Sequence, residues 1–237
     1  SGQFFANAPF DVEVLDFYGT GVGSVSGSGA VVRPDVVLHY TPGGFRFSLQ
    51  DPVYQDADFP DMVASYTYRT ESGHAFNAAV TGREVETGID DSEFGAAFSL
   101  AAKFNFGDTA LALGGYTGKG NNVYSGWGYN GATNPSTIAA RGEVDASGDL
   151  VSTTGLSAGL SHRFSDRLRG NIRYAQVEAD EVAPTVADDT LQMVNVNLIY
   201  TYLPNLDFGI EWRDRNATTM PLRPAGQQVE LMAMYKF

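Results

Sequence analysis

Apolar and polar side chains alternate along most of this chain, most clearly in its last eleven residues, 227–237. One phase of that stretch carries the apolar residues Val229, Leu231, Ala233, Tyr235 and Phe237, and the other carries more polar ones. A period of two predicts a β-strand with one apolar face. The same pattern recurs toward the N-terminus and predicts twelve strands, near residues 2–7, 30–42, 45–51, 62–71, 74–85, 92–106, 109–118, 150–165, 168–178, 191–203, 206–216 and 227–237.

The connections between these strands alternate in length. Short ones such as 41–44 and 203–205 contain Pro, Gly or Asn, which favour tight turns. Long polar loops lie between them, at residues 8–29, 52–61, 86–91, 119–149, 179–190 and 217–226. This layout is typical of outer-membrane barrels. The chain contains no apolar run of about eighteen residues, so no transmembrane helix is predicted. We therefore expect one all-β domain over residues 1–237, a transmembrane antiparallel up-and-down β-barrel.

Aromatic residues support this interpretation. The aromatic C-terminus resembles the closing strand of bacterial outer-membrane β-barrels, where a terminal Phe and an aromatic residue two positions earlier form the assembly signal. The phase that we expect to face lipid includes Phe94, Phe98, Leu100, Val196, Leu198, Phe208, Ile210 and Trp212. Tyrosines near predicted strand ends match an interfacial girdle, in which the ring sits at the headgroup level: Tyr40, Tyr66, Tyr68, Tyr174, Tyr200, Tyr202 and Tyr235.

Charge is divided between the two phases of the strands. The chain has 15 basic and 28 acidic residues, a net charge of -13. On the predicted inward phase we place eleven basic residues, namely Arg33, Arg46, Arg69, Arg83, Lys103, Arg163, Arg169, Arg173, Arg213, Arg215 and Lys236. The inward acids are five, Asp35, Glu93, Asp207, Glu211 and Glu230, so the predicted lumen sums to 11 - 5 = +6.

A basic lumen in a low-dielectric wall favours anions, and Arg binds carboxylates through two parallel hydrogen bonds. The candidate pore-lining residues are Arg33, Arg46, Arg69, Arg83, Lys103, Arg173, Arg213 and Arg215. The alternative is a structural ladder in which these cations pair with Glu211, Glu230 and loop acids. We expect some of the arginines to serve each purpose.

Loop 8–29 is a second candidate feature. It begins with acidic and aromatic residues and becomes rich in Gly and Ser, and glycine permits close approach to a wall. We interpret it as a possible constriction loop that folds inward, with Asp11, Glu13 and Asp16 opposing the arginines across an eyelet. A surface loop over the barrel mouth is the alternative.

The first 55 residues add a family resemblance. The segments GQFFANAPFDVEVLDFYGTGVGSVSG, VVRPDVVLHY, TPGG and FRFSLQDP, at 2–27, 31–40, 41–44 and 45–52, resemble the DcaP-like porins. The resemblance implies a homotrimeric, Arg-lined channel for small dicarboxylates in the bacterial outer membrane. It also implies a sixteen-stranded barrel whose fifth strand is 2–7, and hence four more strands before Ser1. The alternative is a barrel of twelve strands closed between 2–7 and 227–237.

Other functions are less well supported. Ser161 and His162 invite comparison with outer-membrane phospholipases, but adjacent residues of a strand point to opposite faces. A twelve-stranded monomeric channel for acidic oligosaccharides and an adhesive barrel remain alternatives. The absence of Cys excludes thiolate metal sites, and a pI near 4.5 argues against nucleic acid. We predict no enzyme activity, metal or cofactor; the expected partners are small anions, outer-membrane lipid and lipopolysaccharide.

Overall fold

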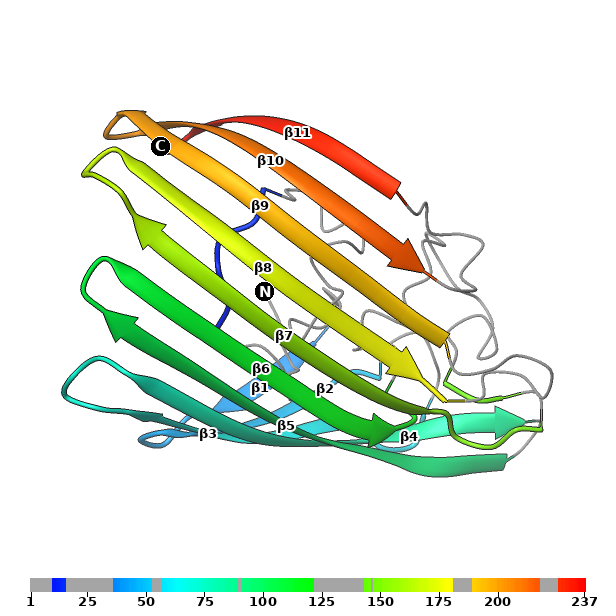
Figure 1. Cartoon of the computed structure of the whole chain (residues 1–237). Coiled ribbons are helices and arrows are strands. Elements are labelled where there is room, and N and C mark those ends of the chain that lie inside the picture. Colours follow the sequence, from blue (N-terminus) through cyan, green and yellow to red (C-terminus); the bar gives the residue numbers. More distant parts are fainter. Residues whose placement is uncertain are drawn as a thin grey trace.

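The structure is a computed structural model that describes residues 10–15, 36–52, 57–88, 91–121, 143–145, 147–180, 189–217 and 226–237. These residues form one sheet of eleven strands, each antiparallel to the next along the chain (Figure 1). The strands are β1 (Val37–Tyr40), β2 (Phe45–Gln50), β3 (Asp61–Arg69), β4 (Ala75–Gly88), β5 (Asp91–Phe106), β6 (Thr109–Lys119), β7 (Ser152–Arg163), β8 (Leu168–Ala179), β9 (Asp189–Leu203), β10 (Leu206–Ala217) and β11 (Gly226–Tyr235).

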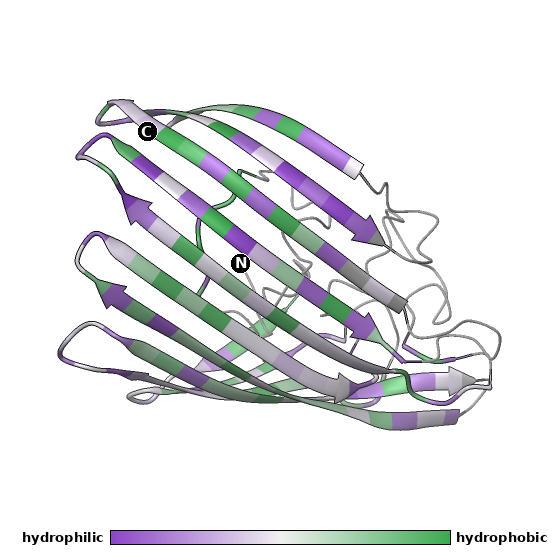
Figure 2. Ribbon diagram, in the orientation of Figure 1, coloured by the Kyte–Doolittle hydropathy of each residue, from purple (hydrophilic) through white to green (hydrophobic). Residues whose placement is uncertain are grey.

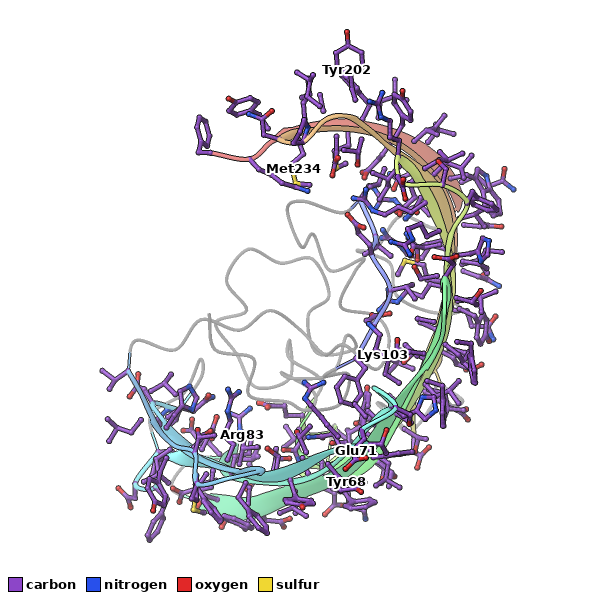
Figure 3. All side chains as sticks on the ribbon, turned by 90° about the vertical axis from the view of Figure 1, so that its left-hand side faces the viewer. Tyr68, Glu71, Arg83, Lys103, Tyr202 and Met234 are labelled. Atoms are coloured by element: carbon purple, nitrogen blue, oxygen red, sulfur yellow. The ribbon has the colours of Figure 1, made fainter. Side chains whose placement is uncertain are left out.

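The order of the strands confirms the predicted all-β, antiparallel up-and-down architecture. Eleven of the twelve predicted strands have a counterpart; the one predicted at 2–7 lies outside the described residues. The sheet curves strongly, so that one face is concave (Figure 3). Within the described ranges β1 and β11 do not pair with each other, and the sheet is open rather than closed into the expected barrel.

Tight turns join the strands at one end of the sheet, on the left in Figure 1. The turn between β5 and β6 has only two residues, Gly107 and Asp108, and Gly107 has a positive φ of 64°. In the turn before β2, Gly43 adopts a similar φ of 59°. A residue with a Cβ is strained in this region of φ, which explains glycine at both positions.

The two faces of the sheet differ in chemistry, and the alternation is visible along each strand in Figure 2. The convex face exposes large apolar side chains, including Phe94, Phe98, Leu100, Val196, Leu198, Phe208, Ile210 and Trp212, which confirms the predicted outward phase. Tyr68 and Tyr202 point away from the concave side, whereas Arg83 and Lys103 point into it (Figure 3). No helix in the described parts of the chain is long and apolar enough to cross a membrane.

Candidate functional site

The segment 10–15, which we call the inner segment, lies against the concave face of the sheet (Figure 3). Phe10, Val12 and Leu15 are all buried, with at most 9% of each side chain exposed. Phe10 and Val12 belong to an apolar cluster with small side chains of the wall, namely Ala75, Ala101 and Ala112. An extended segment is therefore packed on the wall by its own apolar side chains, at sites where the strands carry small residues.

Two glycines of the wall complete this packing. A Cβ added to Gly159 on β7 would lie 2.8 Å from Cγ1 of Val12, and one added to Gly209 on β10 would lie 2.9 Å from Cδ1 of Leu15. Contacts this short between carbon atoms are strongly repulsive. Gly159 and Gly209 thus leave the space that the side chains of the inner segment occupy.

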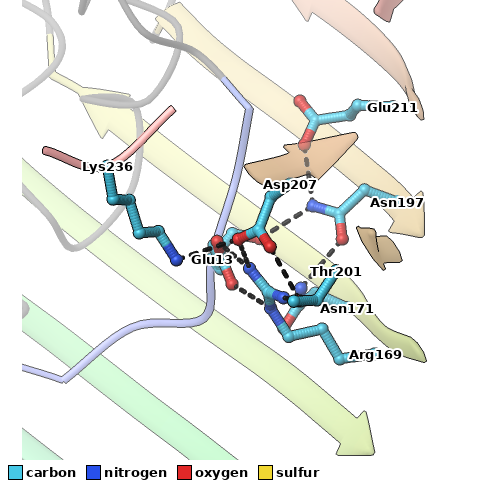
Figure 4. Close-up of polar contacts among 8 residues, drawn as sticks. All are labelled: Glu13, Arg169, Asn171, Asn197, Thr201, Asp207, Glu211 and Lys236. Atoms are coloured by element: carbon cyan, nitrogen blue, oxygen red, sulfur yellow. Dashed lines mark hydrogen bonds and ion pairs between the residues drawn. The ribbon is translucent and has the colours of Figure 1, made fainter. Parts of the chain in front are cut away.

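The acids of the inner segment bind arginines of β8 (Figure 4 shows the pair of Glu13 and Arg169). Arg173 donates to Asp11 through Nη2 at 2.7 Å and through Nε at 3.1 Å. Arg169 donates to Glu13 through Nε at 2.8 Å and through Nη2 at 2.9 Å. Both pairs are bidentate, the strongest geometry for an Arg and a carboxylate. Asp11 and Glu13 therefore touch these arginines instead of facing them across an eyelet; Asp16, the third predicted acid, lies outside the described residues.

Backbone contacts fix the far end of the inner segment. The amide of Leu15 donates to Oε2 of Glu211 at 2.9 Å, and Nδ2 of Asn197 donates to the carbonyl oxygen of Glu13 at 2.8 Å. Glu211 also accepts from Nδ2 of Asn195 at 2.9 Å, and Asn171 donates to Oδ1 of Asn197 at 2.8 Å. A buried polar network across β8, β9 and β10 thus forms hydrogen bonds with the backbone of the inner segment.

Asp207, at the start of β10, connects this network to the last strand (Figure 4). It accepts from Oγ1 of Thr201 at 2.7 Å, from Nη2 of Arg169 at 3.0 Å and from Nζ of Lys236 at 2.9 Å. Its side chain is only 1% exposed. Three donors around one buried carboxylate satisfy its charge and join β8, β9, β10 and the residue after β11.

Arg83 of β4 forms a second buried ionic cluster. Its Nη1 lies 2.5 Å from Oε1 of Glu143, and its Nε lies 3.4 Å from Oδ1 of Asp61. The side chains of Arg83 and Glu143 are fully buried. Both acids fall in predicted long loops, at 52–61 and 119–149, and no clear alternating pattern identifies either as a partner of Arg83. They join Asp11 and Glu13 on the concave side, so the basic surplus there is smaller than the predicted +6.

The other predicted pore-lining residues fall into two groups. Arg213 forms an ion pair with Glu230 and donates to Oε1 of Gln228 at 3.0 Å, and Arg215 is buried. Arg83, Arg173 and Arg213 are thus paired, as the ladder alternative expected. Arg33 lies outside the described residues.

Arg46, Arg69 and Lys103 differ from these, and we call them the basic trio. Within the described parts of the chain no acidic side chain forms an ion pair with any of the three. The guanidinium of Arg69 lies 5.8 Å from the ring centroid of Phe10, at cation–π distance. In the sheet register Arg69 is opposite Ala75, which is opposite Lys103, so the two cations are two strands apart, about 10 Å.

The candidate residues for other functions do not assemble into a site. Ser161 and His162 are adjacent on β7, and Nδ1 of His162 forms a hydrogen bond of 2.8 Å with Oγ1 of Thr109. Among the described residues no group of three or more His, Cys, Asp or Glu side chains is placed to hold a metal ion.

Comparison with known proteins gives the fold. No protein-family model and no curated protein sequence matches the chain. The solved structures that are similar to it include two outer-membrane proteins. The outer membrane channel DcaP of Acinetobacter baumannii has a TM-score of 0.72 at 19% identity, over 98% of this chain and 68% of that one. A loop L8 deletion mutant of OmpT, an outer membrane protein of Vibrio cholerae, has a TM-score of 0.55 at 13% identity, over 97% and 70%.

The fold is therefore that of bacterial outer-membrane β-barrel proteins, and the expected likeness to DcaP is confirmed at the level of structure.

Proposed function

We propose that this protein is a porin of the bacterial outer membrane through which small solutes diffuse passively, with a preference for anions such as dicarboxylates. The observation that carries the proposal is the basic trio, which the register of β2, β3 and β5 places on the concave face of a sheet whose convex face is apolar. The proposal includes a homotrimer that contacts lipid and lipopolysaccharide and neither catalyses a reaction nor binds nucleic acid.

The proposed preference for anions rests on the contrast between cations that have an acidic partner among the described residues and cations that have none there. An Arg in bidentate contact with a carboxylate presents little net field a few ångströms away. Arg46, Arg69 and Lys103 have no such partner in the part of the chain that the structure describes, so their charge is available to a solute. The low-dielectric wall of a narrow channel focuses such a field, which raises the local concentration of anions.

The two groups of cations thus have different proposed roles. Arg83, Arg173 and Arg213 hold the wall together, and the basic trio attracts the solute. Residues Asp11 and Glu13 belong to a constriction loop in this proposal, and their ion pairs attach it to the wall. Arg83, Arg173, Arg213 and Arg215 line the concave side without being the first contacts of a solute.

Ion conduction tests the proposal. Purified protein in a planar bilayer under a salt gradient should give stepwise conductance with a reversal potential of anion-selective sign. Because the expected charge surplus is local, the selectivity should weaken as ionic strength rises and the Debye length falls below about 10 Å. Cation selectivity, or the absence of conductance from folded protein, would contradict the proposed function.

Block of the ion current by a solute identifies the residues that give the preference for anions. Replacing Arg69 and Lys103 together by Gln should weaken block of the current by succinate about tenfold or more, because one charged hydrogen bond contributes about 1.5–3 kcal/mol. Lys236→Gln, which removes a cation already paired with Asp207, serves as the matched control. Equal effects of the two changes would show a diffuse field instead of a defined site.

A further inference from the structure

The inner segment connects two parts of the wall that differ in charge. Its Phe10 end contacts Arg69 of the basic trio and the small residues of β4 and β6. Its Leu15 end contacts Gly209 and Glu211 of β10. Between these ends, Asp11 and Glu13 cover the guanidinium groups of Arg173 and Arg169.

The register of the sheet places the contacts of the Phe10 end in one row. From β3 to β8 the residues directly opposite one another are Arg69, Ala75, Lys103, Ala112, Gly159 and Arg173. Cations therefore occupy both ends and one interior position of the row, and small residues occupy the rest. Ala75 and Ala112 contact the apolar side of the inner segment, and Gly159 receives Val12.

We propose that the inner segment sets the charge that the wall presents to solutes: Asp11 and Glu13 mask Arg173 and Arg169, and Gly159 positions the segment so that masking occurs. This inference rests on the proposed porin function. It gives the two carboxylates a role opposite to that of an eyelet, since they cancel positive charge by contact and so limit anion preference. Gly159 is a positioning residue, and Asp11 and Glu13 are determinants of selectivity.

The size of the masked charge follows from the geometry. Both ion pairs have donor–acceptor distances of about 3 Å, so beyond a few such distances each pair acts as a dipole and not as a full charge. With the segment in place, the unmasked cations of this row are Arg69 and Lys103. Without its two carboxylates, the net charge of this part of the wall would rise by two, while Arg169 would keep its contact with Asp207.

The position of the segment has a test that does not depend on conduction. The Cβ of Val12 lies 3.4 Å from the ideal Cβ position of Gly159, close to the Cβ separation of a disulfide. The chain has no Cys, so Val12→Cys with Gly159→Cys adds the only thiols. Oxidation of the folded protein should crosslink them, which changes the migration of the denatured chain before and after reduction.

A matched pair controls for random collision. Ala179 also lies on the concave side and is opposite Thr153, six residues along β7 from Gly159, which corresponds to about 20 Å. Val12→Cys with Ala179→Cys should therefore remain uncrosslinked. Equal crosslinking of the two pairs, or none with Gly159→Cys in folded protein, would overturn the proposed position of the segment.

Charge selectivity tests the masking itself. Asp11→Asn with Glu13→Gln keeps the shapes of the side chains and removes both negative charges. The anion-to-cation permeability ratio should rise about twofold or more, because the net charge of a low-dielectric wall rises by two. Asp108→Asn, which breaks an exposed pair with Arg163 at a tight turn, is the control and should change the ratio much less.

A compensating pair of substitutions distinguishes displacement of the inner segment from general destabilisation of the protein. Gly159→Ala should shift the permeability ratio in the same direction, since the new Cβ displaces Val12. Val12→Ala removes the two methyl groups that Cβ would meet at 2.8 and 2.9 Å, so the double variant should restore the original ratio. Lack of rescue would overturn the role of Gly159.

The outcomes distinguish this inference from the proposed function. If the unmodified protein conducts without preferring anions and Asp11→Asn with Glu13→Gln still shifts the ratio toward anions, the masking holds and the anion preference fails. If the unmodified protein prefers anions and the variant leaves the ratio unchanged, the porin proposal holds and the masking is wrong.

Discussion

Arg83, Asp61 and Glu143 show how costly a buried charge becomes when its partner is lost. The side chains of Arg83 and Glu143 are fully buried, and that of Asp61 is 3% exposed. Removing charges from water is costly, and the mutual attraction of the three groups compensates for it only while all remain together. The cluster therefore specifies how residues 143–145 lie against β4.

We predict that Glu143→Gln destabilises the protein by about 3–5 kcal/mol, because it leaves the buried guanidinium with less counter-charge. The midpoint of urea unfolding in lipid vesicles measures this change. Asp108→Asn, in the exposed pair with Arg163, should shift the midpoint only slightly. A small shift for Glu143→Gln as well would mean that water reaches Arg83 in the folded protein.

Individual inward residues were predictable where they lie on alternating strands, as with Arg173, Arg213 and Glu211. Their partners were predictable only in part. Glu143 is 60 positions from Arg83 and follows no strand pattern, so its role depends on a long-range packing that local periodicity does not encode. Asp11 and Glu13 were recognised as candidates, but direct contact with Arg173 and Arg169 was not foreseen.

At the scale of single strands, β7 places residues of opposite character side by side. Leu160 is exposed on the convex face between Leu111 and Ile172, its neighbours in the register. Ser161 faces the concave side, opposite Asn171. The strand is therefore expected to tolerate charge at one position and not at the next.

Leu160→Arg should destabilise the protein in a bilayer by up to about 2–4 kcal/mol, the cost of Arg on the lipid face of a barrel near the midplane. Ser161→Arg adds the same side chain toward other arginines and water, so its effect should be much smaller. Urea unfolding in vesicles provides the comparison. Similar costs for the two variants would contradict the assignment of the faces.

The strands themselves were predicted well, because alternation is a local property. The predicted strand 206–216 and the observed β10, Leu206–Ala217, differ by one residue. The inner segment was harder to predict. Its apolar residues have no strand partner in the sequence pattern, and its position depends on the space that Gly159 and Gly209 leave on distant strands.

At the scale of the molecule, the open edges of the sheet require a partner. Backbone amides and carbonyls without hydrogen bonds are very costly in hydrocarbon, which is why strands that span membranes form closed sheets. We predict that in a bilayer the amides of Val37–Tyr40 in β1 and of β11 exchange with deuterium as slowly as those of β6. Fast exchange on both edges, with slow exchange in β6, would contradict a closed barrel.

The identity of this chain to the two structural neighbours described above is only 19% and 13%, yet the fold is shared along nearly its whole length. Alternation, tight turns and aromatic strand ends are enough to specify such a sheet, and many residues satisfy them. Solute preference depends on a few charges and their partners, so it could be proposed from the sequence only in outline.

The row of cations and small residues across β3 to β8 also has a consequence for assembly. If β8 were inserted one residue out of register, Arg169 and Arg173 would face lipid and Ile172 would face water. An Arg on the lipid face costs about 2–4 kcal/mol at the bilayer midplane and less near the interface, where Arg169 lies at the start of β8. A strand in the wrong register should therefore be less stable in the bilayer than a correctly paired one, so the arginines of β8 also favour correct strand pairing when the barrel inserts.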